Sequence, residues 1–222
     1  MNFSEIPVTL FLIAINVIFS LIGFSSPAFL SKTILTPYVV KRENQFYRLI
    51  TSGFLHADFM HLFFNMFTLF FFGSAIEYYF SRHGLGGNIA YLSLYFLSLI
   101  ASDITSYLKH QDDPNYHSLG ASGAVSAVVF GCILFGPWNE IKLYGAISLS
   151  FLVYAVLFIL YCVNMGKRSG DNVNHDAHLW GSIFGLAFTL LLIIMLNPEL
   201  FDLVIKEFSE PSLFGRAPIY LK

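Results

Sequence analysis

Two residues in this 222-residue chain have the types needed for nucleophilic catalysis, and each lies where an apolar run begins. Ser122 stands between glycines in Gly120-Ala121-Ser122-Gly123, ahead of the apolar run 124–135. His178 opens a second run in Ala177-His178-Leu179-Trp180-Gly181. A polar side chain at membrane depth indicates a functional site. A hydroxyl that attacks and an imidazole that takes its proton are the nucleophile and base of a hydrolase.

Two further polar residues have the spacing of an oxyanion hole. His61 and Asn65 are four residues apart and so share one face of a predicted helix. Both side chains can donate hydrogen bonds, and the backbone N–H of Ser122 at a helix start would complete the set. Gly120 and Gly123 are predicted to support this site. The structural alternatives are a polar pair that stabilises its own helix, a serine bonded to a backbone carbonyl, and a packing histidine.

No carboxylate is placed to complete a triad. Asp176 lies two residues before His178 on the same predicted helix and should face elsewhere. Asp103 lies near the matching end of another apolar run, where we expect a solvated interfacial carboxylate. The prediction is therefore a Ser–His dyad.

The other histidines do not indicate a metal site. His56, His61 and His178 lack the cysteines and carboxylates that usually accompany a metal, so neither a metal nor an organic cofactor is expected. His56 is expected at the water interface, either solvated or supporting the site. The remaining histidines are expected to be solvated: His83, His110, His117 and His175.

The composition indicates a polytopic membrane protein. Hydrophobic residues make up 56% of the chain and charged residues 12%, about half the roughly 25% that is usual in soluble domains. The formal net charge of −2 gives no reason to expect nucleic acid as a partner. The first residues lack the basic region of a cleavable signal peptide, so the first apolar run is interpreted as a retained span.

Six stretches are long and apolar enough to predict membrane spans in a single all-α domain covering residues 1–222. They are roughly 7–24, 59–80, 88–108, 117–137, 141–163 and 176–196. The loop 25–58 suggests amphipathic pieces in the interface, 164–174 has the composition of a flexible loop, and 197–222 is predicted to be a short tail. Cys132 and Cys162 should lie near opposite faces as small core residues, with no metal-ligand spacing.

The span count predicts that the polar residues converge. Spans two, four and six run in the same direction, so their first residues share one membrane face. His61, Asn65, Ser122 and His178 all lie near those starts and hence in one shallow layer. Small residues at four-residue spacing in span six, and several in span four, would let these two helices approach closely.

The motifs jointly resemble those of rhomboid intramembrane serine proteases, in the same order along the chain. They are Tyr47-Arg48, Phe54-Leu55-His56, His61-x-x-x-Asn65, Gly73-x-x-x-Glu77, Gly120-x-Ser122-Gly123 and Ala177-His178-x-x-Gly181-x-x-x-Gly185. The resemblance covers the whole six-span region. It implies a six-transmembrane-helix rhomboid bundle, a multi-pass protein of a bacterial plasma membrane. Arg48 and Glu77 are interpreted as architectural.

The resemblance also implies roles for the site residues. Ser122 would be the nucleophile and His178 the base and acid, while His61, Asn65 and the Ser122 N–H would hold the oxyanion. The substrates would be transmembrane helices of other proteins, entering from the lipid bilayer between spans two and five. Aromatic residues of these spans would line the entry: Phe64, Phe151, Tyr154 and Phe158.

Two features depart from the family pattern. Ser126 stands where members often carry an aromatic residue that stacks on the catalytic histidine, so another group, such as Trp180 or a tyrosine, would hold His178. The family's usual orientation places five of the twelve Lys and Arg residues inside and seven outside. The positive-inside rule favours the reverse; the predicted orientation follows the resemblance.

Two functions of other classes compete with the protease. A catalytically silent rhomboid-like protein that binds membrane clients should lack the nucleophile or the base, whereas this chain has both. A proton-conducting transporter should carry polar residues on towards the far face, where spans two, four and six are mostly apolar. The protease is preferred, and the sequence carries no signal for an oligomeric state.

Overall fold

The protein is described by a computed structural model over residues 6–143, 147–166 and 173–211, and it is built mainly of helices. Within these ranges, four helices are long and apolar enough to cross a membrane. They are α1 (Pro7–Ser25), the continuous helix Phe59–Arg82, α7 (Gly87–His110) and α10 (His175–Leu196). The second comprises α5 (Phe59–Thr68), the π-helical turn η3 (Leu69–Gly73) and α6 (Ser74–Arg82). The predicted class, a helical membrane bundle, is confirmed, but the count of six full spans is not.

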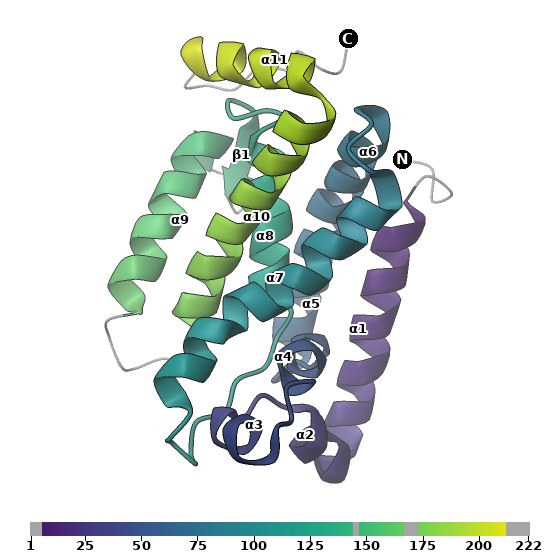
Figure 1. Cartoon of the computed structure of the whole chain (residues 1–222), viewed down its shortest axis with the longest axis vertical. Helices are drawn as coiled ribbons and strands as arrows, with labels where there is room; N and C mark the ends of the chain where they lie inside the picture. The colour runs from purple at the N-terminus through teal and green to yellow at the C-terminus, as the bar shows by residue number, and fades with distance from the viewer. Residues whose placement is uncertain (1–5, 144–146, 167–172, 212–222) are drawn as a thin grey trace.

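Predicted span four is shorter than 117–137 because only its middle part is helical. The helix α8 (Ser122–Ile133) has 12 residues, and eleven of them are buried. It stands behind α7 and α10 in the bundle (Figure 1). A helix surrounded by protein does not have to match the thickness of the lipid. Hydropathy alone cannot separate such a helix from one that faces lipid.

Predicted span five is also partly wrong. Residues 141–143 and 147–150 lie instead in two antiparallel strands, β1 (Glu140–Leu143) and β2 (Ile147–Ser150), with Glu140 opposite Ser150. The helix α9 (Phe151–Met165) follows, and the Ser150 hydroxyl caps it by accepting from Val153 N. Apolar β-branched residues fit a strand as well as a helix, so the boundary was not visible in hydropathy.

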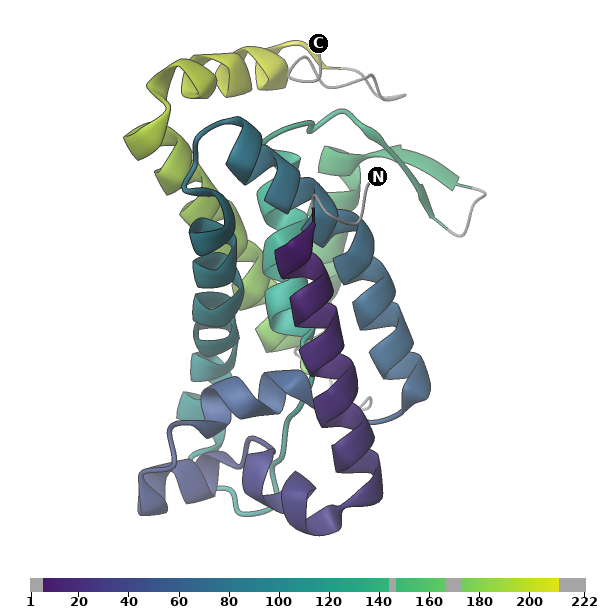
Figure 2. The ribbon, with the colours of Figure 1, turned by 90° about the vertical axis from the view of Figure 1, so that its right-hand side faces the viewer.

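Short helices fill the long loop after α1, at one end of the bundle (Figures 1 and 2). They are α2 (Pro27–Thr33), α3 (Pro37–Glu43), α4 (Arg48–Thr51) and η2 (Ser52–Phe54). The Arg48 guanidinium donates to the carbonyls of Ser31 and Ile34 at 2.9 and 2.7 Å, as its architectural interpretation required. From this end, α5, α8 and α10 all run in the same direction.

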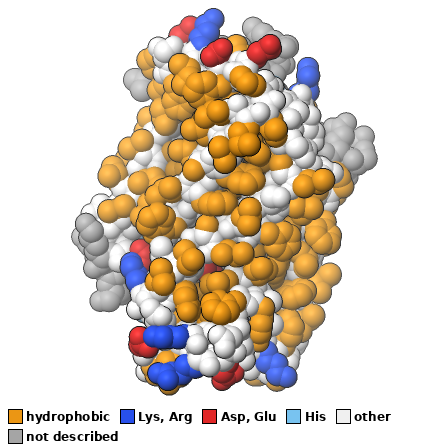
Figure 3. All heavy atoms as spheres, in the orientation of Figure 1, with side chains coloured by type: hydrophobic (Ala, Val, Ile, Leu, Met, Phe, Trp, Pro, Cys, Tyr) orange, Lys and Arg blue, Asp and Glu red, His pale blue; other side chains and the backbone are white. Residues whose placement is uncertain are grey.

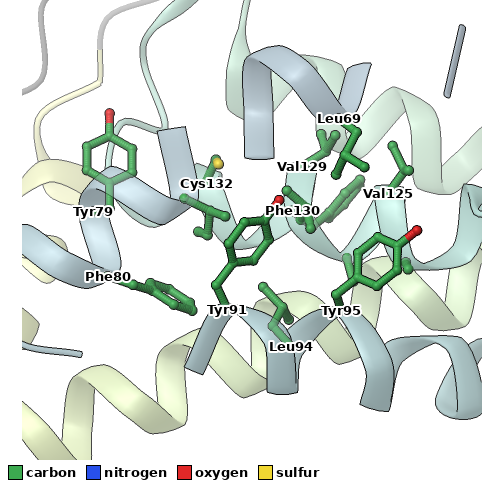
Figure 4. Packing of buried hydrophobic residues seen from close by; sticks show 14 of the residues in the cluster. Leu69, Tyr79, Phe80, Tyr91, Leu94, Tyr95, Val125, Val129, Phe130 and Cys132 are labelled. Carbon is green, nitrogen blue, oxygen red and sulfur yellow. The ribbon is translucent and has the colours of Figure 1, made fainter. Parts of the chain in front are cut away.

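The core lies where α7 packs against α6 and α8 (Figure 4). Phe80, Tyr91 and Tyr95 are fully buried there. The buried Tyr95 hydroxyl accepts a hydrogen bond from Asn16 of α1 at 2.9 Å. Buried Glu77 accepts from the backbone N–H groups of Val8 and Thr9, and so satisfies the start of α1.

The outer surface matches a membrane environment. On the face in Figure 3, hydrophobic side chains cover the middle, and most charged side chains lie near the two ends.

At the end opposite the short helices, α11 (Pro198–Ser209) lies across the bundle and buries Leu200 and Val204. The predicted tail 197–222 is therefore partly wrong, since its first part is a docked helix. The sequence signal was Asn197 before Pro198, a helix cap followed by a favoured first residue.

Candidate active site

Ser122 is the first residue of α8, and the loop before it is firmly held. The backbone of Ser118 pairs with Leu35 in both directions, at 3.1 and 3.0 Å, and Gly120 N donates to Ser52 O at 3.1 Å. Gly120 has φ +130°, a backbone conformation that residues other than glycine rarely adopt. The first N–H groups of α8, including that of Ser122, lack partners within the helix.

Close packing of α8 against α10 brings Ser122 towards His178. A Cβ on Gly181 would overlap the carbonyl of Gly123, and a Cβ on Gly185 would overlap that of Ala127. A Cβ on Gly123 would lie 3.4 Å from the carbonyl oxygen of Ala177. Neighbours of the two candidate residues are thus in direct contact. The predicted small-residue packing is present.

One cavity of about 220 Å³ connects three of the four candidate residues, and His61 is not among the residues that line it. Ser122, His178 and Asn65 all line it, from α8, α10 and α5. The remaining walls are mainly apolar and aromatic: Phe64, Thr68, Val125, Ser126, Val129, Phe130, Tyr154 and Phe158. The structure therefore places in one space residues that the sequence separates by up to 113 positions.

His61 lies close to Gly120, two residues before Ser122, and is oriented by its own helix start. Asp58 caps α5 by accepting from His61 N at 2.8 Å, and the N–H of Ala57 donates to His61 Nδ1 at 3.3 Å. Because Nδ1 accepts, the proton of the neutral ring belongs on Nε2. A Cβ built on Gly120 would be 3.1 Å from His61 Nε2 and 3.8 Å from Ser122 Oγ. The Nε2–H donor and the serine hydroxyl therefore both lie close to Gly120.

Asn65 lies one turn further along α5 and is buried, with 8% of its surface exposed. One of its amide N–H groups donates to His61 O at 2.9 Å. The amide carries a second N–H donor, and the side chain lines the cavity. Asn65 thus has a donor to offer to a group bound there.

His56 is buried, which excludes the first of its two predicted alternatives, a solvated residue. It is 3% exposed, its Nδ1 lies 2.8 Å from Ser20 Oγ, and its ring meets the edge of His61 at 4.9 Å. Burial, and secondarily the charge of His61, lower the pKa of His56 to about 3 despite the opposing effect of Asp58. A neutral His56 packs against the His61 ring, and its supporting role stays a prediction.

Phe158 of α9 stacks on His178, with centroids 6.0 Å apart and planes at 27°, and the His175 ring lies 6.1 Å from His178 in an edge contact. Trp180 is 43% exposed, and it is therefore not buried beside the site as a residue that holds His178 would be. Sequence reasoning assigned Phe158 to the substrate entry. An aromatic ring on the neighbouring helix thus stacks on His178, while α8 carries Ser126 instead of an aromatic residue.

Asn174 is a positioning residue that the sequence analysis missed. Its Oδ1 accepts from Ala177 N at 3.0 Å and so caps α10, while its Nδ2 donates to Ser106 Oγ of α7 and to Ser118 Oγ. It joins the helix of His178 to the loop that leads into Ser122. The signal was an asparagine directly before the apolar run. The predicted flexible loop otherwise falls largely on 167–172, outside the described residues.

The two carboxylates differ in their agreement with the predictions. Asp176 pairs with Lys109 of α7, as expected of a residue that faces away from His178. Asp103 is only 8% exposed and accepts from Ser52 Oγ at 3.4 Å, so its prediction as a solvated residue is wrong. Ser52 also anchors Gly120, and Asp103 therefore supports the loop before α8.

The solvated prediction is also wrong for His175, which is 3% exposed. His83 is half-buried, with its ring stacked on Phe135 at 5.8 Å. His110 stacks on Tyr116, whereas His117 is exposed. Within the described ranges, the one group of His, Cys, Asp or Glu close enough to hold a metal is Cys162, His175 and His178. Sequence spacing did not reveal it, because the cysteine belongs to a different helix.

Comparison with known proteins identifies related chains. The family model described as "Rhomboid domain" matches residues 43–195. A protein of Bacillus subtilis (strain 168), named "Putative rhomboid protease YdcA", is 31% identical over 195 residues, which cover 84% of this chain and 89% of that protein. "Rhomboid-like protease 1" of Toxoplasma gondii is 28% identical over 163 residues, 72% of this chain and 50% of that protein. "RHOMBOID-like protein 12, mitochondrial" of Arabidopsis thaliana is 27% identical over 150 residues, 64% of this chain and 45% of that protein. The chain thus spans nearly all of the bacterial relative and about half of these other two.

Proposed function

Because this chain belongs to the rhomboid family of integral membrane proteins, we propose that it is an intramembrane serine endopeptidase. Its substrates are peptide bonds in or near transmembrane helices of other membrane proteins. The observation that carries the proposal is the single cavity lined by Ser122, His178 and Asn65. The proposed location is a bacterial plasma membrane, since the relative matched along 89% of its length is bacterial.

In the proposed mechanism, Ser122 Oγ attacks the substrate carbonyl carbon while His178 takes the hydroxyl proton. The tetrahedral intermediate collapses, and His178 gives the proton to the departing amine. Water then attacks the acyl-enzyme as His178 takes its proton, and His178 returns that proton to Ser122 Oγ as the ester bond breaks and the new carboxyl end leaves. Every proton transfer passes through His178, and the scheme needs neither a metal nor an organic cofactor.

Three donors are proposed to stabilise the oxyanion of this intermediate. They are the Nε2–H of His61, the free amide N–H of Asn65 and the backbone N–H of Ser122. The support comes from the Ala57 N–H, whose bond to Nδ1 puts the His61 proton on Nε2. A preformed donor in such a site contributes about 2.7–4 kcal/mol to the transition state.

The substrate helix is proposed to enter between α5 and α9. Both helices pack against α8, while the described residues show no comparable packing between α5 and α9. Phe64 of α5 and Tyr154 and Phe158 of α9 line the cavity. Phe151, the fourth aromatic residue predicted for this entry, is buried against Phe72 instead. A helix that enters there must unwind, since its amides are otherwise hydrogen-bonded.

Cleavage of a single-span model substrate by the purified protein in liposomes tests the proposal. Wild type should cut, whereas Ser122→Ala and His178→Ala should each lose at least about 10³-fold in rate. A serine-reactive fluorophosphonate should label wild type but not Ser122→Ala. Wild type that neither cuts nor is labelled across several substrates would favour the silent client-binding protein. Cleavage that survives in Ser122→Ala would exclude the mechanism.

A further inference from the structure

Cys162 of α9 meets two histidines of α10. One ligand atom from each of Cys162, His175 and His178 lies within 4.8 Å of the others. His175 and His178 are three residues apart, which places them on one side of α10, and α9 packs against α10. Cys162 and His175 are 1% and 3% exposed, whereas His178 borders the cavity. The cluster is therefore shielded on one side and open to the cavity on the other.

One thiolate and two imidazole nitrogens form a donor set that suits Zn²⁺ and similar transition-metal ions. With Zn–S near 2.3 Å and Zn–N near 2.0–2.1 Å, the ligand atoms of a tetrahedral site lie about 3.3–3.6 Å apart. The 4.8 Å limit in this structure leaves at most about 1.2–1.5 Å to close, which side-chain rotations can supply. A fourth position would remain for water on the cavity side.

We propose that Cys162, His175 and His178 form an inhibitory binding site for a divalent transition-metal ion of the Zn²⁺ type. The inhibitory role rests on the proposed function, because it acts through His178 as the base. As the metal binds, the Cys162 thiol releases its proton to water, and the sulfur–metal bond replaces the sulfur–hydrogen bond.

Inhibition follows from the chemistry of a neutral imidazole. Such a ring has one nitrogen that carries a proton and one that carries a free lone pair. A metal on His178 occupies that lone pair, whichever nitrogen it uses. The other nitrogen already carries a proton, so His178 can no longer accept one from Ser122. The metal-bound protein should therefore remain folded but be unable to form the acyl-enzyme.

Metal binding can be measured without any protease activity. Metal-free Ser122→Ala protein in detergent is titrated with Co²⁺, a spectroscopic substitute for Zn²⁺. We expect one Co²⁺ per chain with a thiolate-to-cobalt charge-transfer band. The band should be absent from the Ser122→Ala/Cys162→Ser double variant. It should remain in the Ser122→Ala/Cys132→Ser double variant, which changes the other buried cysteine, on α8. No band, or a band that survives Cys162→Ser, would overturn the site.

The inhibitory role has its own measurement. Zn²⁺ should inhibit cleavage by wild type, and a chelator should restore it. Relative to each variant's own metal-free rate, Cys162→Ser should raise the inhibitory Zn²⁺ concentration at least about tenfold, since even outer-shell changes cost 10- to 100-fold in affinity. Equal inhibition of Cys162→Ser and wild type, or activation by Zn²⁺, would overturn the inhibitory role. A wild type without protease activity would refute the proposed function and the inhibition with it, while the Co²⁺ titration would still decide whether the site exists.

Discussion

Gly181 of α10 lies directly against the backbone carbonyl of Gly123 in α8, with no room for a side chain between them. Gly123 is the neighbour of Ser122, and Gly181 lies one turn beyond His178. This contact between two backbones therefore sets the separation of the proposed nucleophile and base.

The first prediction concerns this contact. Gly181→Ala should push α8 and α10 apart, lower the free energy of unfolding by about 1–3 kcal/mol, and reduce cleavage at least about tenfold, because about 1 Å of misplacement can cost 10²-fold. Thermal unfolding in detergent and cleavage rates measure both effects. Ala187→Val adds volume to the exposed side of the same helix and should change neither. A fully active Gly181→Ala protein would contradict the prediction.

The second prediction concerns Gly120, where a Cβ would lie 2.9 Å from His61 Cε1. Gly120→Ala should displace His61 and lower kcat by about 10²-fold, the effect of losing one oxyanion donor. Gly84→Ala is the matched control, since Gly84 also has a positive φ of +65° but nothing within 4 Å of an added Cβ. If both variants lose activity equally, backbone strain rather than the displaced ring is responsible.

The third prediction separates the proposed donor role of Asn65 from its structural bond. Asn65→Leu keeps the approximate volume but removes the donor, and kcat should fall about 10²- to 10³-fold with little change in KM. Asn164→Leu removes a similar amide bond to the carbonyl four residues earlier, from an exposed position on α9. That control should cleave at the wild-type rate. A loss confined to KM would assign Asn65 to substrate binding instead.

The fourth prediction is a pH dependence of stability. Burial lowers the pKa of His56 from 6.5 to about 3 in the folded protein. Below pH 6.5 the unfolded chain therefore binds a proton that the folded protein does not. The free energy of unfolding should fall by up to about 1.4 kcal/mol per pH unit from below pH 6.5 down to about pH 3.

Unfolding measured in detergent between pH 7 and pH 4 checks this slope. His56→Gln should be less stable at pH 7 and should lose part of the slope, since it removes the titrating ring. His117→Gln, at an exposed histidine, should keep the wild-type slope. An unchanged slope in His56→Gln would show that another group is responsible.

The most successful predictions from the sequence were those that depend on the direction of the spans and on helical periodicity. Parallel spans imply that Asn65, Ser122 and His178 start from one face, and the structure places all three on one cavity. Hydropathy predicted the wrong helix length for α8, which has 12 residues instead of the 21 predicted. An apolar segment has the same hydropathy whether it is buried in protein or in lipid.

The side-chain contacts between different helices could not be predicted from the sequence pattern. Phe158 faces His178, and Cys162 approaches His175, through packing of α9 on α10 that no local spacing encodes. Likewise, a buried Asp103 was not predicted, because a carboxylate near a helix end is usually solvated. Its position depends on Ser52, which comes from the distant interfacial loop.

The short length of α8 has a consequence for where in the membrane the protein would cut its substrates. Twelve residues rise roughly 18 Å, against about 30 Å for a hydrocarbon layer. If the proposed function holds, the hydroxyl that starts α8 is fixed at a set depth, and the bilayer rather than a side-chain pocket determines which part of a substrate reaches it. Since the depth of Ser122 does not change with the lipid, thicker membranes should shift the cleavage site along the substrate by whole residues.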